Sequence, residues 1–518
     1  MLTPRHHALF LALLVVINLQ FNANNISIND DDTDYFRTAE NNAEPTISSL
    51  NSTHVEDDNF QLPNNFTALD FTITNTSEYI FAGYFSGTVQ LNSTNTISSN
   101  ASSEDMLVLQ TDFNGTILNN FHAGGSDDDR IRGMDIDPYG NLYLGGYMGG
   151  DLDLNGTQYL TADREGVVFK LDPSFNVIWS NNVTTNGNGN EIADVKWNST
   201  NSIAVVGDCN KTKNGISFNN NGSNIVTYKN CDVRYPSNYS ILSNEANTGV
   251  NIYVAKLNST GDWQWAKKTE GKGTGTSSIM LDVFAKKVWY DSSGRIVIQG
   301  NTTSTYASGS SNPPGDWSLS GIGIKFGDYK ISNVNSNGVF FGRLSESGNI
   351  GLAMATHLGY NAADPGANDR WWFNGTEEME DGRVSMYNYG ARKIVQGLRT
   401  TTPTSACANN QPVNSHISWL NETLCTSDGY SVFAGSGTIG YVSTTSAHSN
   451  LSNLIVTFQG TGTITLGSDD VILTSSDTPV VAHINTSKSK SSPHSTEYGW
   501  GWAVPLDNYA GYSIDGSI

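Results

Sequence analysis

The chain has little positive charge, few cysteines and no long apolar run after its N-terminus. Its 518 residues contain 28 Lys and Arg against 50 Asp and Glu, which gives a formal net charge of −22. Proteins that bind nucleic acids need basic patches to neutralise phosphate, so we expect no nucleic-acid partner. A membrane-spanning helix needs roughly 20 apolar residues, and we expect no stable membrane span.

Familiar catalytic motifs are also missing. The sequence has no GxSxG, no HExxH, no Walker A loop and no GxGxxG that follows a strand. It has no CxxC, and no His lies close to the cysteines, which argues against zinc. Stretches rich in Leu, Ala, Glu and Lys, the strong helix formers, are scarce. We expect an all-β protein that is not an enzyme and needs no cofactor, apart from the calcium considered below.

The N-terminus predicts export. Residues 8–17 are apolar, follow Arg5, and form a core of the length of a signal peptide, which we place at residues 1–23. Residues 24–62 are polar and acidic and cannot bury enough apolar surface to become ordered, so we expect a linker or a loosely held arm. The mature protein is therefore expected to be secreted or displayed at the cell surface.

Sequons and cysteines agree with export. There are about twenty Asn-x-Ser/Thr sequons, so a glycoprotein is expected, although a chain rich in Asn, Ser and Thr also produces them by chance. Four cysteines allow three pairings. We favour Cys209–Cys231 and Cys407–Cys425, because each pair lies inside one insertion and an oxidising compartment permits disulfides.

The sequence does contain a repeated phrase. Each copy consists of a hydrophobic strand, a polar turn and a second strand. Copies begin at Met106, Gly166, Ile252 and Gly338, and a weaker one begins at Pro479. A second phrase that ends in Gly begins at Tyr79, Leu142, Ser202 and Arg295, with a fifth expected at Lys393. A period of this length is typical of a propeller or a solenoid.

The second copy predicts four strands. We place them at residues 132–137, 142–147, 167–171 and 177–181. Turns rich in Pro, Gly, Asn and Asp join them. Long insertions fall between strands two and three, at residues 211–250, 302–338 and 398–478. Their shared place puts them on one face, where binding surfaces tend to develop.

These repeats predict a β-propeller of four-stranded antiparallel blades over residues 63–508, with about five recognisable blades. Residues 509–518 look like the first strand of a further, incomplete blade. Three explanations are open: truncation at Ile518, which we favour, a final strand that closes the ring with the N-terminal arm, or an open array. An open unit would expose sheet edges, which natural proteins usually cover.

The sequence resembles the SBBP-type β-propeller repeat of secreted bacterial and archaeal proteins. The matching segments are DPYGNLYLGGY from Asp137, GVVFKLDPSFNVIW from Gly166, IYVAKLNSTGDWQW from Ile252 and YFSGTVQL from Tyr84. The resemblance covers most of residues 65–508, best in the first three copies. It implies a propeller at or outside the cell surface, and it implies no reaction.

Ligand-binding candidates lie in one aromatic and acidic segment. Trp371 and Trp372 could stack on a sugar ring, beside Asp369, Glu377 and Glu378. The alternative is that one Trp packs between blades and the acids are solvated. Trp500 and Trp502 alternate on one strand, so we expect both to face one side and to pack in the core.

Calcium is a second candidate. Asp127 and Asp129, from a run of three acids, could bind it together with Asp135. Three adjacent acids cannot all point at one ion, so a solvated turn is the favoured interpretation.

Three functions remain open from the sequence. The first is a binding or adhesion module whose inserted loops contact polysaccharide or a surface protein. The second is a carbohydrate-active enzyme on a propeller, with carboxylates near Trp371. The third is a surface-layer or filament component that assembles itself through edge strands.

Overall fold

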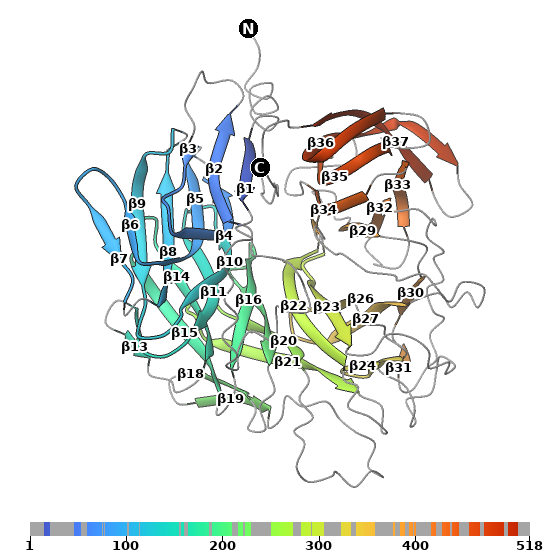
Figure 1. The fold of residues 1–518 in the computed structure, drawn as a ribbon. Coiled ribbons are helices and arrows are strands. Elements are labelled where there is room, and N and C mark those ends of the chain that lie inside the picture. The colour runs from blue at the N-terminus through green and yellow to red at the C-terminus, as the bar shows by residue number, and fades with distance from the viewer. Residues whose placement is uncertain are drawn as a thin grey trace.

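The chain is an all-β protein built from antiparallel sheets (Figure 1). The computed structural model describes these residues: 15–20; 46–52; 60–304, with gaps at 75, 77, 101–102, 113, 155–156, 160–163, 186–188, 210–215, 221–222, 229–249, 273–280 and 292; 323–332; 338–357; and strands between 377 and 505. Within these ranges there is no helix, and so none that could cross a membrane.

Four successive units each contain four strands that pair in chain order. Unit 1 consists of β4 (Phe66–Ile73), β5 (Tyr79–Ser86), β8 (Glu104–Thr111) and β9 (Ile117–Ala123). Unit 2 consists of β10 (Arg130–Ile136), β11 (Leu142–Met148), β14 (Glu165–Leu171) and β15 (Val177–Thr185). Unit 3 consists of β16 (Asn190–Trp197), β17 (Ile203–Cys209), β20 (Asn251–Leu257) and β21 (Trp263–Lys272). Unit 4 consists of β22 (Leu281–Tyr290), β23 (Ile296–Ser304), β26 (Gly338–Leu344) and β27 (Ile350–His357).

The strands expected in the second copy are confirmed to within a few residues, as the bounds of unit 2 show. The glycine that ends the second phrase also has a clear structural reason. The first strand of each unit bulges by one residue opposite a glycine of the second strand, at Gly83, Gly146, Gly207 and Gly300. At Gly146 a Cβ atom would come within 1.9 Å of the carbonyl oxygen of Arg130, so only glycine fits.

The sheets pack face to face, and the four first strands lie side by side. β4, β10, β16 and β22 contact one another in that order. A continuous apolar cluster fills each gap between sheets, as where Ile80, Met106 and Val108 of unit 1 meet Leu142, Val167 and Phe169 of unit 2. In Figure 1 the sheets follow one another in an arc around a common centre, from blue to yellow, with a red C-terminal sheet beyond them.

Carboxylates on the first strands join neighbouring units. Asp70 Oδ2 accepts the backbone N–H of Met134 at 2.7 Å, and Asp194 Oδ2 accepts that of Val288 at 2.8 Å. Gly133 occupies this position in unit 2, and Asp135 accepts the N–H of Trp197 instead, at 2.7 Å. Each junction therefore includes at least one hydrogen bond from a backbone N–H of one unit to a side-chain carboxyl of its neighbour, in a largely buried place.

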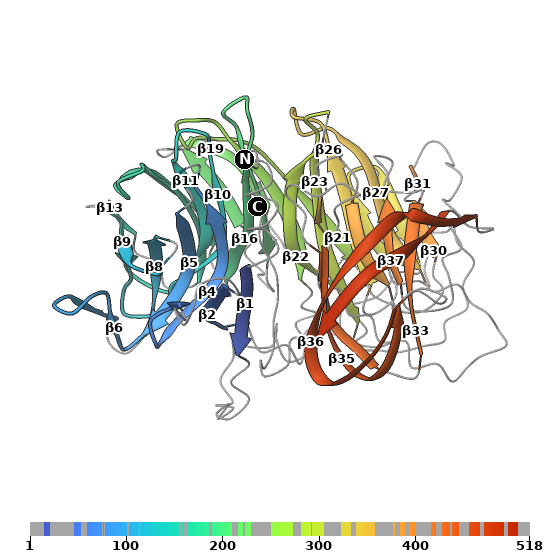
Figure 2. The same ribbon diagram turned by 90° about the horizontal axis from the view of Figure 1, so that it is seen from above.

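Insertions between the second and third strands extend the sheet of the preceding unit. The hairpin β18 (Ile216–Asn220) and β19 (Ser223–Tyr228) comes from unit 3 and pairs with β15. The hairpin β24 (Gly323–Phe326) and β25 (Tyr329–Ser332) comes from unit 4 and pairs with β21. Figure 2 shows β10, β16 and β22 side by side when the molecule is seen from above. In unit 1, β6 (Thr88–Gln90) and β7 (Thr96–Ser98) form a separate hairpin, as do β12 (Leu152–Leu154) and β13 (Thr157–Tyr159) in unit 2.

The C-terminal region departs from the expected repeat. The phrase at Lys393 forms β30 (Lys393–Gln396), which extends unit 4 by pairing with β27. β31 (Leu398–Arg399) pairs with β25. An eight-stranded sheet contains the remaining strands: β28 (Glu377–Glu378), β29 (Val384–Asn388), β32 (His416–Leu420), β33 (Ser427–Gly435), β34 (Thr438–Thr444), β35 (Ile455–Leu466), β36 (Val471–Ser491) and β37 (Thr496–Pro505).

One expectation about this sheet is wrong, and a second stays a prediction. The polar residues that follow Ile484 were expected to form a turn, but they continue β36, and β37 pairs back from residue 496 onward. Trp500 and Trp502 pair with Ile484 and His483 across a register shift. The side chain of Trp502 lies outside the described residues, so the expectation that both tryptophans face one side stays a prediction. Trp500 itself is fully buried, as expected for core packing.

The N-terminal residues include short strands. β1 (Val15–Gln20), β2 (Thr46–Ser52) and β3 (Phe60–Gln61) form a small sheet, and β2 contacts β4. β2 and β3 lie within the range for which an acidic linker was expected. The acidic cluster at residues 30–34 and the terminal segment 509–518 lie outside the described residues.

Candidate functional site

Short turns of one design are gathered at one end of the units. The turns that join strands one and two, and strands three and four, have five residues and begin with Asp, Asn, Ser or Thr. In seven of them the first side-chain oxygen accepts the N–H groups of the third and fifth residues, as Asp137 does from Tyr139 and Asn141. Because strands alternate in direction, these turns share one end, and the insertions lie at the other.

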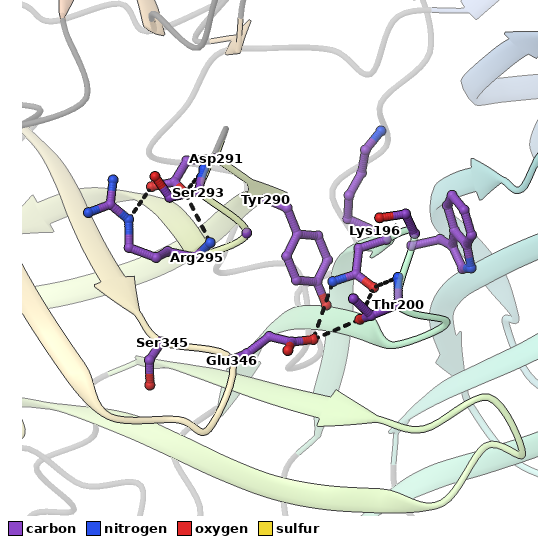
Figure 3. A pocket seen from close by; sticks show the side chains of 12 residues that line it. Lys196, Thr200, Tyr290, Asp291, Ser293, Arg295, Ser345 and Glu346 are labelled. Atoms are coloured by element: carbon purple, nitrogen blue, oxygen red, sulfur yellow. Dashed lines mark hydrogen bonds and ion pairs between the residues drawn. The ribbon is translucent and has the colours of Figure 1, made fainter.

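A cavity of about 640 Å³ opens at the turn end between units 3 and 4. Three turns supply its walls: residues 198–202 of unit 3, and residues 291–295 and 345–349 of unit 4. Figure 3 shows Glu346 and Thr200 joined across the junction, with Tyr290 beside them and Arg295 folded against Asp291. The remaining lining comes from Lys196, Trp197, Asn198, Ser199, Ser293, Gly294 and Ser345.

Glu346 is the centre of the polar network. Its Oε1 atom accepts hydrogen bonds from Thr200 Oγ1 at 2.9 Å, Ser202 Oγ at 3.0 Å and Lys256 Nζ at 3.1 Å. Partial burial alone would raise the pKa of this carboxyl, but the donated hydrogen bonds, led by that of Lys256, lower the pKa to about 2. Glu346 is therefore ionised at neutral pH, and 40% of its side chain remains exposed to the cavity and solvent.

The other charges around the cavity are also paired. Arg295 Nε donates to Asp291 Oδ2 at 2.7 Å, and Lys196 Nζ lies 3.0 Å from Asp135 Oδ1. The charge of Asp135 raises the pKa of Lys196, so this ammonium stays protonated. Each cation of the lining thus has a carboxylate partner, and the cavity has no excess of either sign.

Two aromatic side chains complete the lining. Tyr290 lies at the end of β22, and its hydroxyl is 3.3 Å from Ser202 Oγ. Burial raises the pKa of Tyr290, so it remains a neutral hydroxyl. Trp197 ends β16, and its Nε1 donor is buried with no hydrogen-bond partner among the described residues. Aromatic faces beside carboxylates and hydroxyls are suited to hold a ligand with both apolar and polar faces.

Sequence reasoning did not find this site. Glu346 and Thr200 are separated by 146 positions and meet only because neighbouring units stack. One signal was present in the repeat. The turn of unit 2 begins with Asp137, whose carboxylate lies 3.8 Å from Lys170, whereas unit 3 has the neutral Asn198 and takes its carboxylate from Glu346 of the next unit.

The predicted ligand residues are not brought together in the described structure. Asp369, Trp371 and Trp372 lie outside the described residues, and Glu377 with Glu378 forms the short strand β28. Their role as a ligand site stays a prediction.

The predicted calcium ligands have separate partners. Asp129 is fully buried and accepts the N–H groups of Gly125 at 2.8 Å and Gly149 at 3.0 Å. Asp135 faces Lys196, as described above, and Asp127 is exposed and accepts from Ser126 Oγ. Within the described ranges no group of three or more His, Cys, Asp or Glu side chains is placed to hold one ion. A calcium site therefore has no support from this arrangement.

Cys209 is buried at the end of β17 and is not a free thiol. Cys231, Cys407 and Cys425 lie outside the described residues. The pairings Cys209–Cys231 and Cys407–Cys425 stay predictions.

A second polar cluster lies between units 2, 3 and 4. Glu191 and Asp208 are direct partners across β16 and β17, and Arg164 Nη2 donates to Glu191. Burial, followed by the charge of Glu191, raises the pKa of Asp208 well above its usual range. Asp208 is only 6% exposed and accepts the N–H of Ala285 at 2.6 Å. We therefore interpret this cluster as a set of polar contacts that joins the units, and not as a ligand site.

No family model matches the chain. No curated protein matches it either. The resemblance to the SBBP-type repeat stays a prediction.

Proposed function

We propose that this protein is a secreted or cell-surface β-propeller of the SBBP type that acts as a binding module, and that it holds a polysaccharide segment in the cavity around Glu346. The observation that carries the proposal is the cavity itself, in which aromatic, carboxylate and hydroxyl groups of two units converge. Four stacked four-stranded units with adjacent first strands support the propeller.

The charge balance of the lining favours a neutral ligand rich in hydroxyl groups. Asp291, Glu346, Lys196 and Arg295 are all engaged in ion pairs. A phosphate or carboxylate ligand would have to compete with these partners for Lys196 or Arg295. Sugar hydroxyls both donate and accept hydrogen bonds, so they can add to ionised groups without replacing their partners.

The ionised state of Glu346 does not suit the role of general acid in hydrolysis. A general acid needs a pKa near the working pH, and the pKa of Glu346 is about 2. This carboxylate accepts hydrogen bonds and has no proton to donate at neutral pH. The alternative of a carbohydrate-active enzyme rests on Trp371 and its neighbours, and reducing-sugar release from a polysaccharide would reveal it.

Binding is tested with the full secreted chain on a glycan array, followed by calorimetry with the best ligand. Glu346→Gln removes the charge, and Thr200→Val removes a hydroxyl that lines the cavity. We expect each variant to weaken binding about tenfold, which corresponds to ~1.4 kcal/mol.

The matched control is Tyr139→Ala. Tyr139 is 78% exposed on the corresponding turn of unit 2, outside the cavity, and its loss should leave the affinity unchanged. If no glycan binds, or if binding survives both cavity variants, the proposed site is wrong. Assembly that grows with protein concentration in the absence of glycan would favour the surface-layer function instead.

A further inference from the structure

Three sequons among the described residues share one tripeptide and one local turn. Asn92, Asn198 and Asn258 each begin the sequence Asn-Ser-Thr. In each, Oδ1 of the asparagine accepts the N–H and the hydroxyl of the threonine two positions on, with hydroxyl distances of 3.0, 2.6 and 2.8 Å. Because sequence and turn are the same, their surroundings distinguish the three as acceptors of a glycan.

A sequon is recognised through two groups, the side-chain amide of its asparagine and the hydroxyl of its third residue. An enzyme that modifies the folded protein has to reach both groups from solvent. The contact with Oδ1 holds these groups together in all three turns. What differs is the exposure of each turn and the partner of the nucleophilic Nδ2 atom.

Asn92 presents both groups to solvent. It lies in the turn between β6 and β7, where residues 92–96 are all exposed. Its Nδ2 atom has no hydrogen-bond partner among the described residues, because the turn uses Oδ1 and main-chain groups. In Figures 1 and 2 the hairpin of β6 and β7 projects from the side of unit 1.

Open space lies beside Asn92. It lines a cavity of about 320 Å³ together with residues that include Leu62, Gln90 and Ile117. This volume is at the lower end of the ~300–1,000 Å³ of ordinary ligand pockets. The first sugar of an attached glycan therefore has room against these side chains.

Asn198 is partly buried and faces the next unit. Its Nδ2 atom lies 3.4 Å from Oε1 of Glu346, and the hydroxyl of Thr200 lies 2.9 Å from the same oxygen. Both recognition groups of this sequon are therefore engaged at the junction of units 3 and 4.

Asn258 is closed by its own turn and by the preceding unit. Its Nδ2 atom and the hydroxyl of Thr260 both donate to Oδ2 of Asp262, at 3.3 and 2.7 Å. Trp179 of unit 2 lies over the same turn and donates its Nε1–H to the carbonyl of Ser259 at 3.1 Å. An enzyme would have to displace these contacts to reach Asn258.

Three further sequons lie in or against strands. Asn301 in β23 is only 8% exposed, and Asn182 in β15 donates its Nδ2–H to Oε2 of Glu165 at 2.8 Å. The tripeptide of Asn65 contains Phe66, which is 2% exposed. These tripeptides become accessible only when a sheet opens.

Asn114 is exposed but lacks the turn of Asn92. Asp112 holds the N–H groups of Asn114 and Thr116, and Gly115 between them has a φ angle of 84°. No hydrogen bond joins the Asn114 side chain to the hydroxyl of Thr116 in the described part of the chain. The two recognition groups are therefore not held together as they are at Asn92.

We propose that Asn92 is the preferred N-glycosylation site of the folded protein among the sequons that the structure describes. The donor is an oligosaccharide joined through its C1 carbon to a polyprenyl diphosphate. Nδ2 of Asn92 attacks C1, and the N–C1 bond forms as the bond from C1 to the diphosphate oxygen breaks. The diphosphate leaves with that electron pair, and one amide proton passes to a base of the transferase. This site does not depend on the proposed polysaccharide cavity.

The test uses the folded full chain, produced without glycans, with a purified oligosaccharyltransferase and its polyprenyl-linked oligosaccharide. Mass spectrometry of intact glycopeptides then measures the occupancy of each sequon. We expect occupancy at Asn92 to exceed that at Asn198 and Asn258 by about tenfold or more, because those two become accessible only on local opening. In a chain denatured beforehand, the three identical tripeptides should be modified to similar extents.

Two variants assign the acceptor and the recognition group. Asn92→Asp keeps an oxygen for the turn but removes the nucleophilic nitrogen, so the glycopeptide should disappear. Thr94→Val removes the hydroxyl and should abolish modification, whereas Thr94→Ser should retain it. A folded chain with no glycan at Asn92, or with more glycan at another described sequon, would overturn the proposal. The same preference in the denatured chain would show that the fold does not set it, and would overturn the proposal as well.

Discussion

Trp179 lies directly on Gly261, the positive-φ residue of the next unit's turn, and a methyl group there would meet the indole at 2.5 Å. Two separate costs follow for any larger residue at position 261. The left-handed backbone conformation costs an L-residue roughly 1–2 kcal/mol, and the clash with the ring adds the cost of overpacking.

Gly261→Ala should therefore destabilise the protein by about 3 kcal/mol, as measured by urea unfolding. Gly294→Ala is the matched control. Gly294 has a φ angle of 71°, but a Cβ atom there would meet nothing within 4 Å. We expect the Gly294→Ala variant to lose only about 1 kcal/mol of unfolding free energy. Equal losses in both variants would show that the indole contact contributes nothing.

The Phe175 side chain should be replaceable by the indole of a tryptophan that packs on a glycine, as Trp179 packs on Gly261. At the junction of units 1 and 2, Asn119 takes the register position of Trp179, and Phe175 takes that of Gly261 and is 6% exposed. Phe175→Gly should cost about 3 kcal/mol through the cavity it leaves. Asn119→Trp alone should also destabilise, because Phe175 occupies the space.

The double variant Asn119→Trp with Phe175→Gly recreates the other junctions. It should be more stable than the sum of the single changes predicts, by about 1–3 kcal/mol in a double-mutant cycle. Strict additivity would mean that the two positions do not share one space.

The fold could be predicted from the sequence to the extent that it is repeated. The alternation in residues 142–147 and the turns with Gly140 and Gly261 specify strands and hairpins locally, and the structure follows them. The C-terminal part is different because its phrases are weaker. β33 contains YSVFAG, a close copy of the phrase at Tyr79, which was missed in favour of Lys393.

The candidate site could not be predicted, because a contact between units depends on departures from the repeat. Nothing in the residues around Glu346 shows that they will face Thr200 and Lys256. Only the stacked geometry, with the turn of unit 4 beside that of unit 3, brings them together. The replacement of Asp137 by Asn198 in the repeat was the single local signal.

The ionisation of Glu346 should make the free energy of unfolding depend on pH in the acidic range. Its pKa in the folded protein, about 2, is below the 4.5 of an unperturbed Glu. A lowered pKa stabilises the folded state above pH 4.5, and that contribution is lost as the pH falls from about 4.5 to about 2. Because the side chain is 40% exposed, solvent screening reduces the effect to about 1 kcal/mol.

Glu346→Gln should remove this dependence, so that thermal melts of the variant and the wild type converge near pH 2 and differ at pH 7. Asp328→Asn provides the control, since Asp328 is an exposed turn residue outside the cavity. A wild-type advantage that persists unchanged at pH 2 would contradict the assignment of the lowered pKa to Glu346.

The ionisation of Asp129 should lower the free energy of unfolding as the pH rises, which is opposite to the effect of Glu346. Burial, only partly offset by the N–H groups of Gly149 and Gly125, raises its pKa to about 8 from 3.8. The folded protein therefore holds a proton that the unfolded chain releases. The stabilisation is complete below pH 3.8 and is lost as the pH rises to about 8, with a slope that approaches ~1.4 kcal/mol per pH unit.

Asp129→Asn removes the ionisable group and should flatten the fall of the unfolding free energy between about pH 4 and pH 8, at the cost of one acceptor for the two glycine amides. Urea unfolding at intervals of one pH unit measures it, as the difference between variant and wild type. Asp127→Asn changes an exposed neighbour and should leave the slope as it is. Parallel pH profiles for the wild type and Asp129→Asn would mean that Asp129 is ionised in the folded protein, and that its two amide hydrogen bonds outweigh its burial.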